Sequence, residues 1–175
     1  MTKIGAFIKD LIIIVLLALA LAVVLKTFVV DSRIIPSASM HPTIQINDRI
    51  LINKFIYRFE DVERGNIIVF KPNADTGETR DMLKRAIGLP GETVEIKDNL
   101  VYINDTPLEE DYLAEAPDYQ FGPVTIPDNC VFVLGDNRNK SADAHVWLNP
   151  FLEINKIKGK AFCIYWPINH MESLT

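Results

Sequence analysis

An apolar run near the N-terminus constrains this chain more than any other feature. Residues 11–25 contain no charged side chain, and Lys26 is followed by four uncharged residues before Asp31. A helix that spans a bilayer needs about 20 mostly apolar residues. Residues 11–30 supply that length if Lys26 extends its amine to the membrane interface. The run therefore predicts a single transmembrane helix.

A cleaved secretory signal is the alternative for this run, because small residues within it follow two lysines. Cleavage there would leave apolar residues 23–30 on the mature protein, so a retained anchor is favoured. The positive-inside signal is weak, since basic residues lie on both sides of the run. We place the N-terminus in the cytoplasm because the anchor comes first. Residues 1–31 are then a cytoplasmic tip and anchor, and residues 32–175 form a domain outside the membrane.

The remaining chain is patterned as short strands separated by Gly and Pro turns. We predict strands at 49–56, 66–70, 81–87, 92–97, 100–104, 130–134 and 157–166. Asp98-Asn99 is typical of a two-residue hairpin, and residues 105–128 are predicted to be a long surface excursion. A helix beyond the anchor is considered only at residues 149–154. The pattern favours a mainly β fold, with a β-barrel-like or β-sandwich domain.

Composition argues against several classes of partner. The formal net charge of −5 and the absence of a basic cluster make nucleic acid an unfavourable partner. Cys130 and Cys163 are far apart, and the chain has only three histidines, so we predict neither a metal site nor a cofactor. The sequence leaves open whether the two cysteines are paired.

Two serines lie one residue apart in a segment bounded by Pro36 and Pro42. Proline fixes its own φ and favours extended geometry in the residue before it, which predicts a stiff, extended segment. Ser37 and Ser39 would then face the same way, so that one hydroxyl can attack while the other donates a hydrogen bond. A Ser/Pro-rich juncture between an anchor and a domain is the alternative.

A serine nucleophile needs a base, and the histidines do not offer one. His41 lies in the serine segment, His170 lies in the tail, and His145 has no triad context. A lysine can act instead if it is kept neutral. Lys84 lies in an otherwise apolar predicted strand, and a decrease in its pKa of roughly 2.4 units would leave it half neutral near pH 8. Burial and the charge of Arg85 can supply that decrease, whereas a solvated charge on the strand face is the alternative.

A dense polar loop, residues 135–143, directly follows a short apolar strand. Loops held by rigid strands often carry functional sites. A surface turn stabilised by Asn and Asp hydrogen bonds is the alternative for this loop.

Together these segments resemble the type I signal peptidases, membrane-bound Ser/Lys proteases that remove signal peptides from exported proteins. Residues 36–43 resemble the family's Pro-Ser-x-Ser-Met-x-Pro-Thr motif, and residues 48–54 are similar to the box that follows it. Residues 84–92 resemble the lysine box, and residues 135–143 the last one. The resemblance covers most of the chain and implies the fold and activity of that family.

The resemblance assigns roles to four hydroxyl and amine groups. It implies that Ser39 is the nucleophile and that Lys84 is the general base, which later protonates the leaving amine. Ser37 and the Ser39 backbone N–H would form the oxyanion hole. Ser141 would orient the Lys84 amine.

Charged residues around these groups are implied to have supporting roles. Asp136 would pair with Arg85, and Asp143 would brace the loop that carries Ser141. The sequence departs from the family where Ala144-His145 replaces the common Ser-Arg, so a salt bridge from Asp143 to a following arginine is missing.

The resemblance also implies a substrate and a location. The family binds signal-peptide-bearing preproteins as an added strand and prefers small residues at the −1 and −3 positions. Ile35, Met40 and Leu83 would form the walls of shallow apolar pockets. The expected partners are preproteins and the lipid bilayer of a bacterial plasma membrane, with a thylakoid-type membrane as the alternative.

Two other functions remain open at this point. A self-processing Ser/Lys protease related to the LexA repressors shares the dyad, but an apolar N-terminal segment replaces the DNA-binding domain. A catalytically inactive, membrane-tethered peptide-binding module is the other alternative, because the sequence does not show whether Lys84 is neutral.

Overall fold

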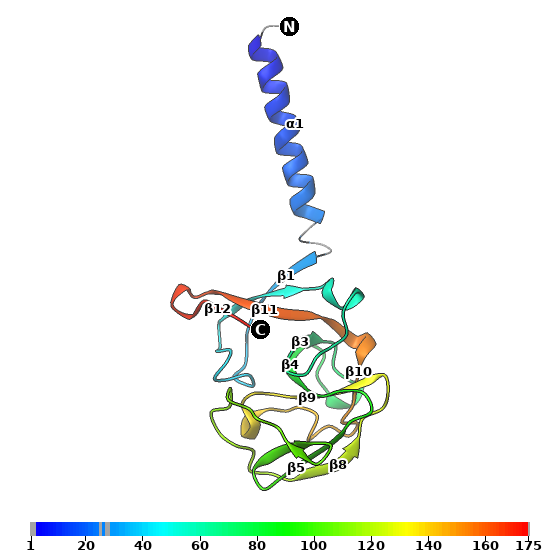
Figure 1. Ribbon diagram of the computed structural model, residues 1–175. Helices are drawn as coiled ribbons and strands as arrows, with labels where there is room; N and C mark the ends of the chain where they lie inside the picture. Colours follow the sequence, from blue (N-terminus) through cyan, green and yellow to red (C-terminus); the bar gives the residue numbers. More distant parts are fainter. Residues whose placement is uncertain (1–2, 25, 27–28, 175) are drawn as a thin grey trace.

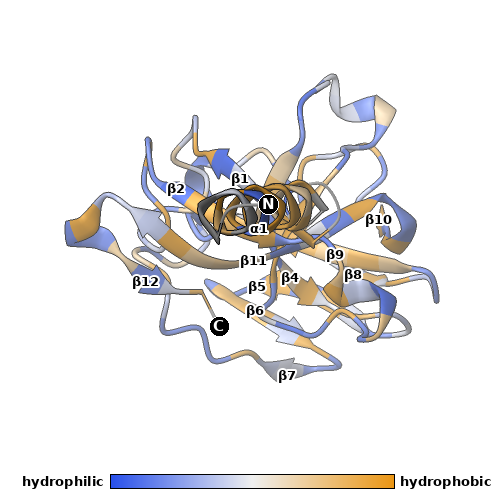
Figure 2. Cartoon of the chain, turned by 90° about the horizontal axis from the view of Figure 1, so that it is seen from above, coloured by the Kyte–Doolittle hydropathy of each residue, from blue (hydrophilic) through white to orange (hydrophobic). Residues whose placement is uncertain are grey.

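The computed structural model describes residues 3–24, 26 and 29–174, which form one long helix and a β-domain. Helix α1 (Lys3–Val24) projects away from the β-domain (Figure 1). Figure 2, which looks along the axis of α1, shows mostly hydrophobic residues in this helix. No helix within the described residues is long and apolar enough to cross a membrane.

The predicted helix at residues 11–30 is wrong at both ends. Helix α1 begins earlier and already ends at Val24, while residues 25, 27 and 28 lie outside the described residues. Strand β1 (Val30–Ile34) starts where the helix was expected to end. The later end of the predicted helix is wrong because of a tertiary contact: Val30 pairs with Asn53 of the neighbouring strand. This backbone pairing outweighs the helical preference of the apolar run.

The described residues of the β-domain form twelve strands in two sheets, and the prediction of a mainly β fold is confirmed. The larger sheet has the order β1-β2-β11-β3-β4-β9-β10, with β12 paired to β11. Its other strands are β2 (Arg49–Asn53), β3 (Ile67–Phe70), β4 (Met82–Gly88), β9 (Cys130–Leu134), β10 (Leu152–Glu153), β11 (Ile157–Trp166) and β12 (Glu172–Ser173). Strand β4 thus lies between β3 and β9, deep within the sheet.

The smaller sheet has the order β7-β6-β5-β8. Its strands are β5 (Thr93–Lys97), β6 (Leu100–Ile103), β7 (Thr106–Pro107) and β8 (Phe121–Thr125). Asp98 and Asn99 connect β5 to β6 with φ values of 51° and 63°, as a tight hairpin of this kind requires. The excursion predicted at residues 105–128 is wrong in part, because β7 and β8 within it pair with β6 and β5.

Short 3₁₀ turns occupy several connections. They are η2 (Ile56–Arg58), η3 (Ala74–Thr76), η4 (Arg138–Lys140), η5 (Ile154–Lys156) and η6 (Ile168–His170). The helix considered at residues 149–154 is wrong, because β10 and η5 occupy that region. The backbone of Leu152 and Glu153 instead pairs with β9. Cys130 and Cys163 are not bonded to each other.

Two apolar clusters hold the β-domain together. The larger takes side chains from both sheets, among them Phe70, Ile96 and Phe132. The smaller includes Met40 and Ile44, both of which are fully buried. Burying each such side chain contributes about 1.5–3 kcal/mol. The smaller cluster therefore fixes the segment that carries the two serines.

Candidate active site

The serine segment is a turn, so the extended conformation predicted for it is wrong. The His41 N–H donates to the Ala38 carbonyl at 3.1 Å, and the Ile44 N–H donates to the Met40 carbonyl at 2.9 Å. These bonds bring Met40 and Ile44 one turn apart, where both enter the smaller core. Apolar burial on this side outweighs the extended preference that the prolines give to their neighbours.

The polar loop of residues 135–143 fastens the serine segment from the other side. The Asn137 backbone N–H donates to the Ser39 carbonyl at 3.1 Å, and the Asn137 side-chain amide donates to the Ala38 carbonyl at 3.0 Å. Two of the three predicted site segments are therefore in direct contact, although they are far apart in sequence.

A groove of about 600 Å³ brings the third segment to the serines. Its lining includes Ser37, Ser39 and Lys84. The three residues predicted to bind substrate, Ile35, Met40 and Leu83, line the same groove. Within the described residues, no atom accepts a hydrogen bond from the Ser39 backbone N–H, which leaves this donor available to a ligand.

Lys84 is placed in the groove by β4, directly opposite Ile68 of β3. Only 3% of its surface is exposed. This burial lowers the pKa of Lys84 to about 8, although the charges of Asp143 and Asp136 act in the opposite direction. Arg85, which we expected to lower the pKa further, is paired with Asp136 instead. A substantial fraction of the Lys84 amine is therefore neutral in mildly basic solution.

Ser141 lies next to the serine segment across Gly135. The Ser141 hydroxyl is buried and has no hydrogen-bond partner among the described residues. A Cβ atom on Gly135 would lie 2.3 Å from the Ser141 Oγ and 2.4 Å from the Ser39 carbonyl oxygen. Both groups thus approach the same point on the Gly135 backbone, and only the absence of a side chain permits this.

If Ser39 is the nucleophile that its motif implies, Gly135→Ala should lower kcat/KM about 100-fold, because displacing a reacting group by about 1 Å can cost that much. The new methyl group would push the Ser39 carbonyl or the Ser141 side chain aside. Gly159→Ala is a matched control, since its Cβ would lie 2.4 Å from the Asn53 carbonyl oxygen, away from the groove. Both variants are measured by peptide cleavage corrected for the folded fraction. Equal specific activity in the two variants would contradict the tight packing inferred at Gly135.

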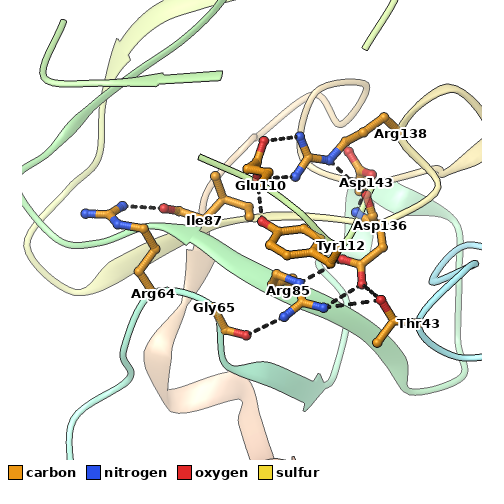
Figure 3. A network of polar contacts seen from close by, with 11 residues as sticks. Thr43, Arg64, Gly65, Arg85, Ile87, Glu110, Tyr112, Asp136, Arg138 and Asp143 are labelled. Atoms are coloured by element: carbon orange, nitrogen blue, oxygen red, sulfur yellow. Dashed lines mark hydrogen bonds and ion pairs between the residues drawn. The ribbon is translucent and has the colours of Figure 1, made fainter. Parts of the chain in front are cut away.

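Arg85 and Asp136 form a buried ion pair (Figure 3). The Arg85 Nε and Nη2 donate to the two Asp136 carboxylate oxygens at 2.8 and 2.6 Å. The Thr43 hydroxyl donates to the same carboxylate at 2.6 Å, and Arg85 also donates to the Gly65 carbonyl at 2.9 Å. Asp136 therefore connects β4 to the end of the serine segment, and the pairing predicted between Asp136 and Arg85 is present.

A second buried pair was not predicted from the sequence. Arg138 donates through both terminal nitrogens to Glu110, at 2.8 and 2.5 Å, and through Nε to the Gly135 carbonyl at 3.1 Å. Tyr112 donates to Glu110, and its ring lies 3.9 Å from the Arg85 guanidinium carbon. Figure 3 shows these side chains stacked beside the Asp136 pair. Glu110 and Tyr112 lie within residues 105–128, which we predicted to be a surface excursion. In the sequence, only the place of Arg138 in the polar loop pointed to this pair.

His145 occupies the position for which the family resemblance implies an arginine. Its Nδ1 lies 2.6 Å from an Asp143 carboxylate oxygen, and its ring stacks on Tyr119 at 3.9 Å. The second Asp143 oxygen accepts the Gly135 N–H at 2.8 Å. The interaction expected to be missing is thus replaced by a histidine contact, and Asp143 contacts the start of the loop that carries Ser141.

Comparison with known proteins identifies the family. The model of the family described as signal peptidase, peptidase S26, matches residues 8–166. The chain belongs to this family. It is therefore an enzyme of the S26 serine endopeptidases, as the sequence motifs predicted.

Several relatives cover most of the chain. A protein named probable signal peptidase I-2, from Synechocystis, is 46% identical over 162 residues, which are 90% of this chain and 73% of that protein. Signal peptidase I S of Bacillus subtilis is 33% identical over 168 residues, or 90% and 88% of the two chains. Thylakoidal processing peptidase 1 of Arabidopsis thaliana is 35% identical over 86% of this chain and 46% of that protein.

A solved structure agrees with the sequence comparison. A crystal structure of a signal peptidase I from Enterococcus faecalis superposes with a TM-score of 0.50 and 34% identity. The superposition covers 58% of this chain and 97% of that one. The β-domain therefore has the fold of the signal peptidases.

Proposed function

We propose that this enzyme cuts signal peptides from exported preproteins with Ser39 as nucleophile and Lys84 as general base. One observation carries the proposal: Ser39 and a buried Lys84 with a pKa near 8 line the same groove. A buried amine that loses its proton in this pH range can accept the hydroxyl proton of a serine.

The reaction follows from these positions. Ser39 Oγ attacks the carbonyl carbon of the scissile bond, and its proton passes to Lys84 Nζ. The tetrahedral oxyanion is stabilised by the Ser39 N–H and the Ser37 hydroxyl, each worth about 3–4 kcal/mol when preorganised. Lys84 then returns the proton to the leaving amine. A water molecule, deprotonated by Lys84, hydrolyses the acyl-enzyme and releases Ser39.

The surrounding residues position this pair. The buried Ser141 hydroxyl lacks a partner among the described residues and lies beside Ser39 across Gly135, where it can accept a hydrogen bond from Lys84. Asp143 holds the backbone N–H of Gly135, and the Asp136 pair with Arg85 supports the serine segment through Thr43. These are positioning roles, because none of the three charged groups lines the groove.

The substrate lies in the groove as an extended strand, by the β-addition mode common in peptide recognition. Ile35, Met40 and Leu83 give the groove an apolar wall beside the serines. Pockets bounded by these side chains accept alanine or glycine at the −1 and −3 positions and exclude larger residues by steric overlap.

Helix α1 would hold the enzyme at the membrane where its substrates emerge. The described part of α1 carries a long series of exposed apolar side chains, from Phe7 to Val23. We propose a single-pass protein with residues 1–31 as tip and anchor and residues 32–175 as the outer catalytic domain. A bacterial plasma membrane or a thylakoid-type membrane would place preproteins and the groove on the same surface, at high effective concentration.

The test is cleavage of a preprotein by the full chain in detergent or lipid. With alanine at −1 and −3, we expect one cut after the −1 residue, identified by mass spectrometry of the new N-terminus. The same preprotein with phenylalanine at −1 is the control and should be cut at least about 100-fold more slowly. Binding of the preprotein without any cut would overturn the proposal in favour of an inactive peptide-binding module.

A further inference from the structure

The contact between His145 and Asp143 is a feature of this chain, because the family resemblance implies an arginine in place of the histidine. The His145 Nδ1 lies 2.6 Å from an Asp143 carboxylate oxygen. Only 13% of the His145 side chain is exposed, and the Asp143 side chain is fully buried. A carboxylate can only accept hydrogen bonds, so Nδ1 is the nitrogen that donates. Little water reaches this contact, which makes it stronger than a surface pair.

A stacked ring fixes the orientation of the His145 side chain. Its ring lies on the Tyr119 ring, with the ring centres 3.9 Å apart and the planes 12° apart. The segment that carries Tyr119 is fastened to the polar loop, because the Asn139 side-chain amide donates to the Ala116 carbonyl at 3.0 Å. The imidazole is therefore held on one face by Tyr119 and at Nδ1 by Asp143.

Asp143 connects this imidazole to the groups that we propose as catalytic. Its second carboxylate oxygen accepts the Gly135 N–H at 2.8 Å. A Cβ atom on Gly135 would lie 2.3 Å from the Ser141 Oγ and 2.4 Å from the Ser39 carbonyl oxygen. A displacement of Asp143 would therefore be passed to the backbone against which both serines pack. His145 lies one contact behind Asp143, so it acts on the two serines through that carboxylate.

Asp143 also acts on Lys84 through its charge. Burial lowers the pKa of Lys84, whereas the charges of Asp143 and Asp136 raise it. Asp136 is paired with the Arg85 guanidinium, which balances its charge. Asp143 contacts a histidine instead. The charge on the His145 ring therefore determines how strongly Asp143 favours the protonated form of the Lys84 amine.

The other charged groups near the imidazole leave this contact dominant. Burial raises the pKa of Tyr119, so its phenol stays neutral while Lys84 titrates. The charged groups that act on Tyr119 besides Asp143 are Arg138, Glu110 and Asp118. The first two neutralise each other in the buried pair described above. The third is exposed, so solvent screens its charge.

We propose that His145 is a positioning residue for Ser39 and Lys84, which holds Asp143 in place and tempers its charge at the Lys84 amine. The proposal rests on the proposed function, because it takes Lys84 to be the base. An arginine stays charged at every working pH, whereas a histidine side chain ordinarily loses its charge near pH 6.5. A histidine partner for Asp143 therefore lets Lys84 keep its proton to a higher pH than an arginine partner would.

The first test is preprotein cleavage by two variants of the full chain in detergent, corrected for the folded fraction. His145→Phe keeps a ring that can stack on Tyr119 but has no donor for Asp143. Its kcat should fall about 10–100-fold with KM little changed, because the loss lies in the placement of reacting groups. His145→Asn offers an amide N–H near the place of Nδ1 and should recover most of the activity.

The second test measures the Lys84 pKa directly, from the chemical shift of the Lys84 Cε in isotope-labelled full chain. The signal is assigned by its absence in Lys84→Met. His145→Arg places a permanent charge beside Asp143 and should lower the Lys84 pKa by roughly half a pH unit. His170→Arg is the matched control, because it adds the same charge beside a different buried carboxylate, that of Asp48, which His170 contacts at 2.9 Å. This control should leave the Lys84 pKa unchanged.

Recovery of kcat in His145→Asn, together with a lower Lys84 pKa in His145→Arg alone, supports the proposal. A His145→Phe variant that cuts like the parent, or an unchanged Lys84 pKa in His145→Arg, overturns it, as does an equal decrease in the His170→Arg control. The pKa measurement does not need cleavage. A parent protein that cuts no preprotein would contradict the proposed function, and the Lys84 pKa would still decide whether His145 controls the charge at that amine.

Discussion

Replacing Lys84 with methionine is expected to abolish cleavage and, at pH 7, to make the protein more stable. Methionine has a similar shape but no amine, so no base remains to accept the Ser39 proton. Removing one member of a catalytic unit of this kind lowers kcat by roughly 10⁴–10⁶-fold. If Ser39 and Lys84 act together as proposed, Ser39→Ala combined with Lys84→Met should lose little more activity than either change alone.

The stability gain follows from the direction of the Lys84 pKa shift. Burial lowers its pKa from 10.5 to about 8 in the folded state, so the unfolded chain holds this proton more tightly. Below pH 8 the folded protein carries the full cost of a buried charge, about 3 kcal/mol for a shift of this size. That cost falls as the pH rises from 8 to 10.5 and is absent above. Lys84→Met removes it, which should raise the melting temperature by about 6–12 °C at pH 7.

The dependence of the parent's kcat/KM on pH provides a second measurement of the Lys84 pKa. If the neutral amine is the base, kcat/KM rises about tenfold per pH unit below pH 8 and levels off above it. Cleavage rates from pH 6 to 10, with melting curves over the same range, measure both effects. Lys71→Met removes an exposed amine and should change neither. A Lys84→Met variant that melts below the parent at pH 7, or a rate that does not vary with pH, would contradict the assignment.

The residues that we propose as catalytic could be singled out in the sequence because each lies in a short motif with distinctive chemistry, and the structure brings them to one groove. Lys84 is identified by an apolar strand around a single amine, and its burial follows from the central position of that strand. Ser37 and Ser39 are identified by their spacing. Their turn was not predicted, because it depends on Met40 and Ile44 entering a core that long-range contacts create.

The pair of Arg138 with Glu110 was not predicted, for the same reason. Glu110 and Tyr112 lie in an acidic, proline-bearing stretch without periodicity, and only the folded chain brings them to Arg138 and Arg85. The boundary between α1 and β1 is a similar case. The apolar run continues through Val30, but Val30 pairs with β2 and is therefore part of the sheet. The pattern of apolar residues determines which secondary structure a segment prefers locally. Contacts with residues distant in sequence determine where each helix or strand ends.

Asp136→Ala is expected to cause a large loss of stability, because it leaves the Arg85 guanidinium buried without its carboxylate. The Asp136 side chain is fully buried, and only 8% of the Arg85 side chain is exposed. Removing one partner of such a pair destabilises a protein by about 3–5 kcal/mol, which here corresponds to a decrease in melting temperature of roughly 10–15 °C. The Thr43 hydroxyl also loses its acceptor, so the serine segment is held less firmly. The activity of the variant relative to the parent should therefore be lower than the fraction of the variant that is folded.

Two comparisons separate the buried pair from a general effect of removing a carboxylate. Glu153→Ala breaks a partly exposed contact with Lys156 at 2.7 Å and should leave the melting temperature almost unchanged, because solvent screens such pairs. Asp136→Ala combined with Arg85→Met removes both charges and should cost less than the two single changes added together. Thermal unfolding of the four variants measures both differences. If Asp136→Ala melts like Glu153→Ala, the pair does not hold β4 to the serine segment. The Asn137 hydrogen bonds and the smaller core would then hold that segment in place.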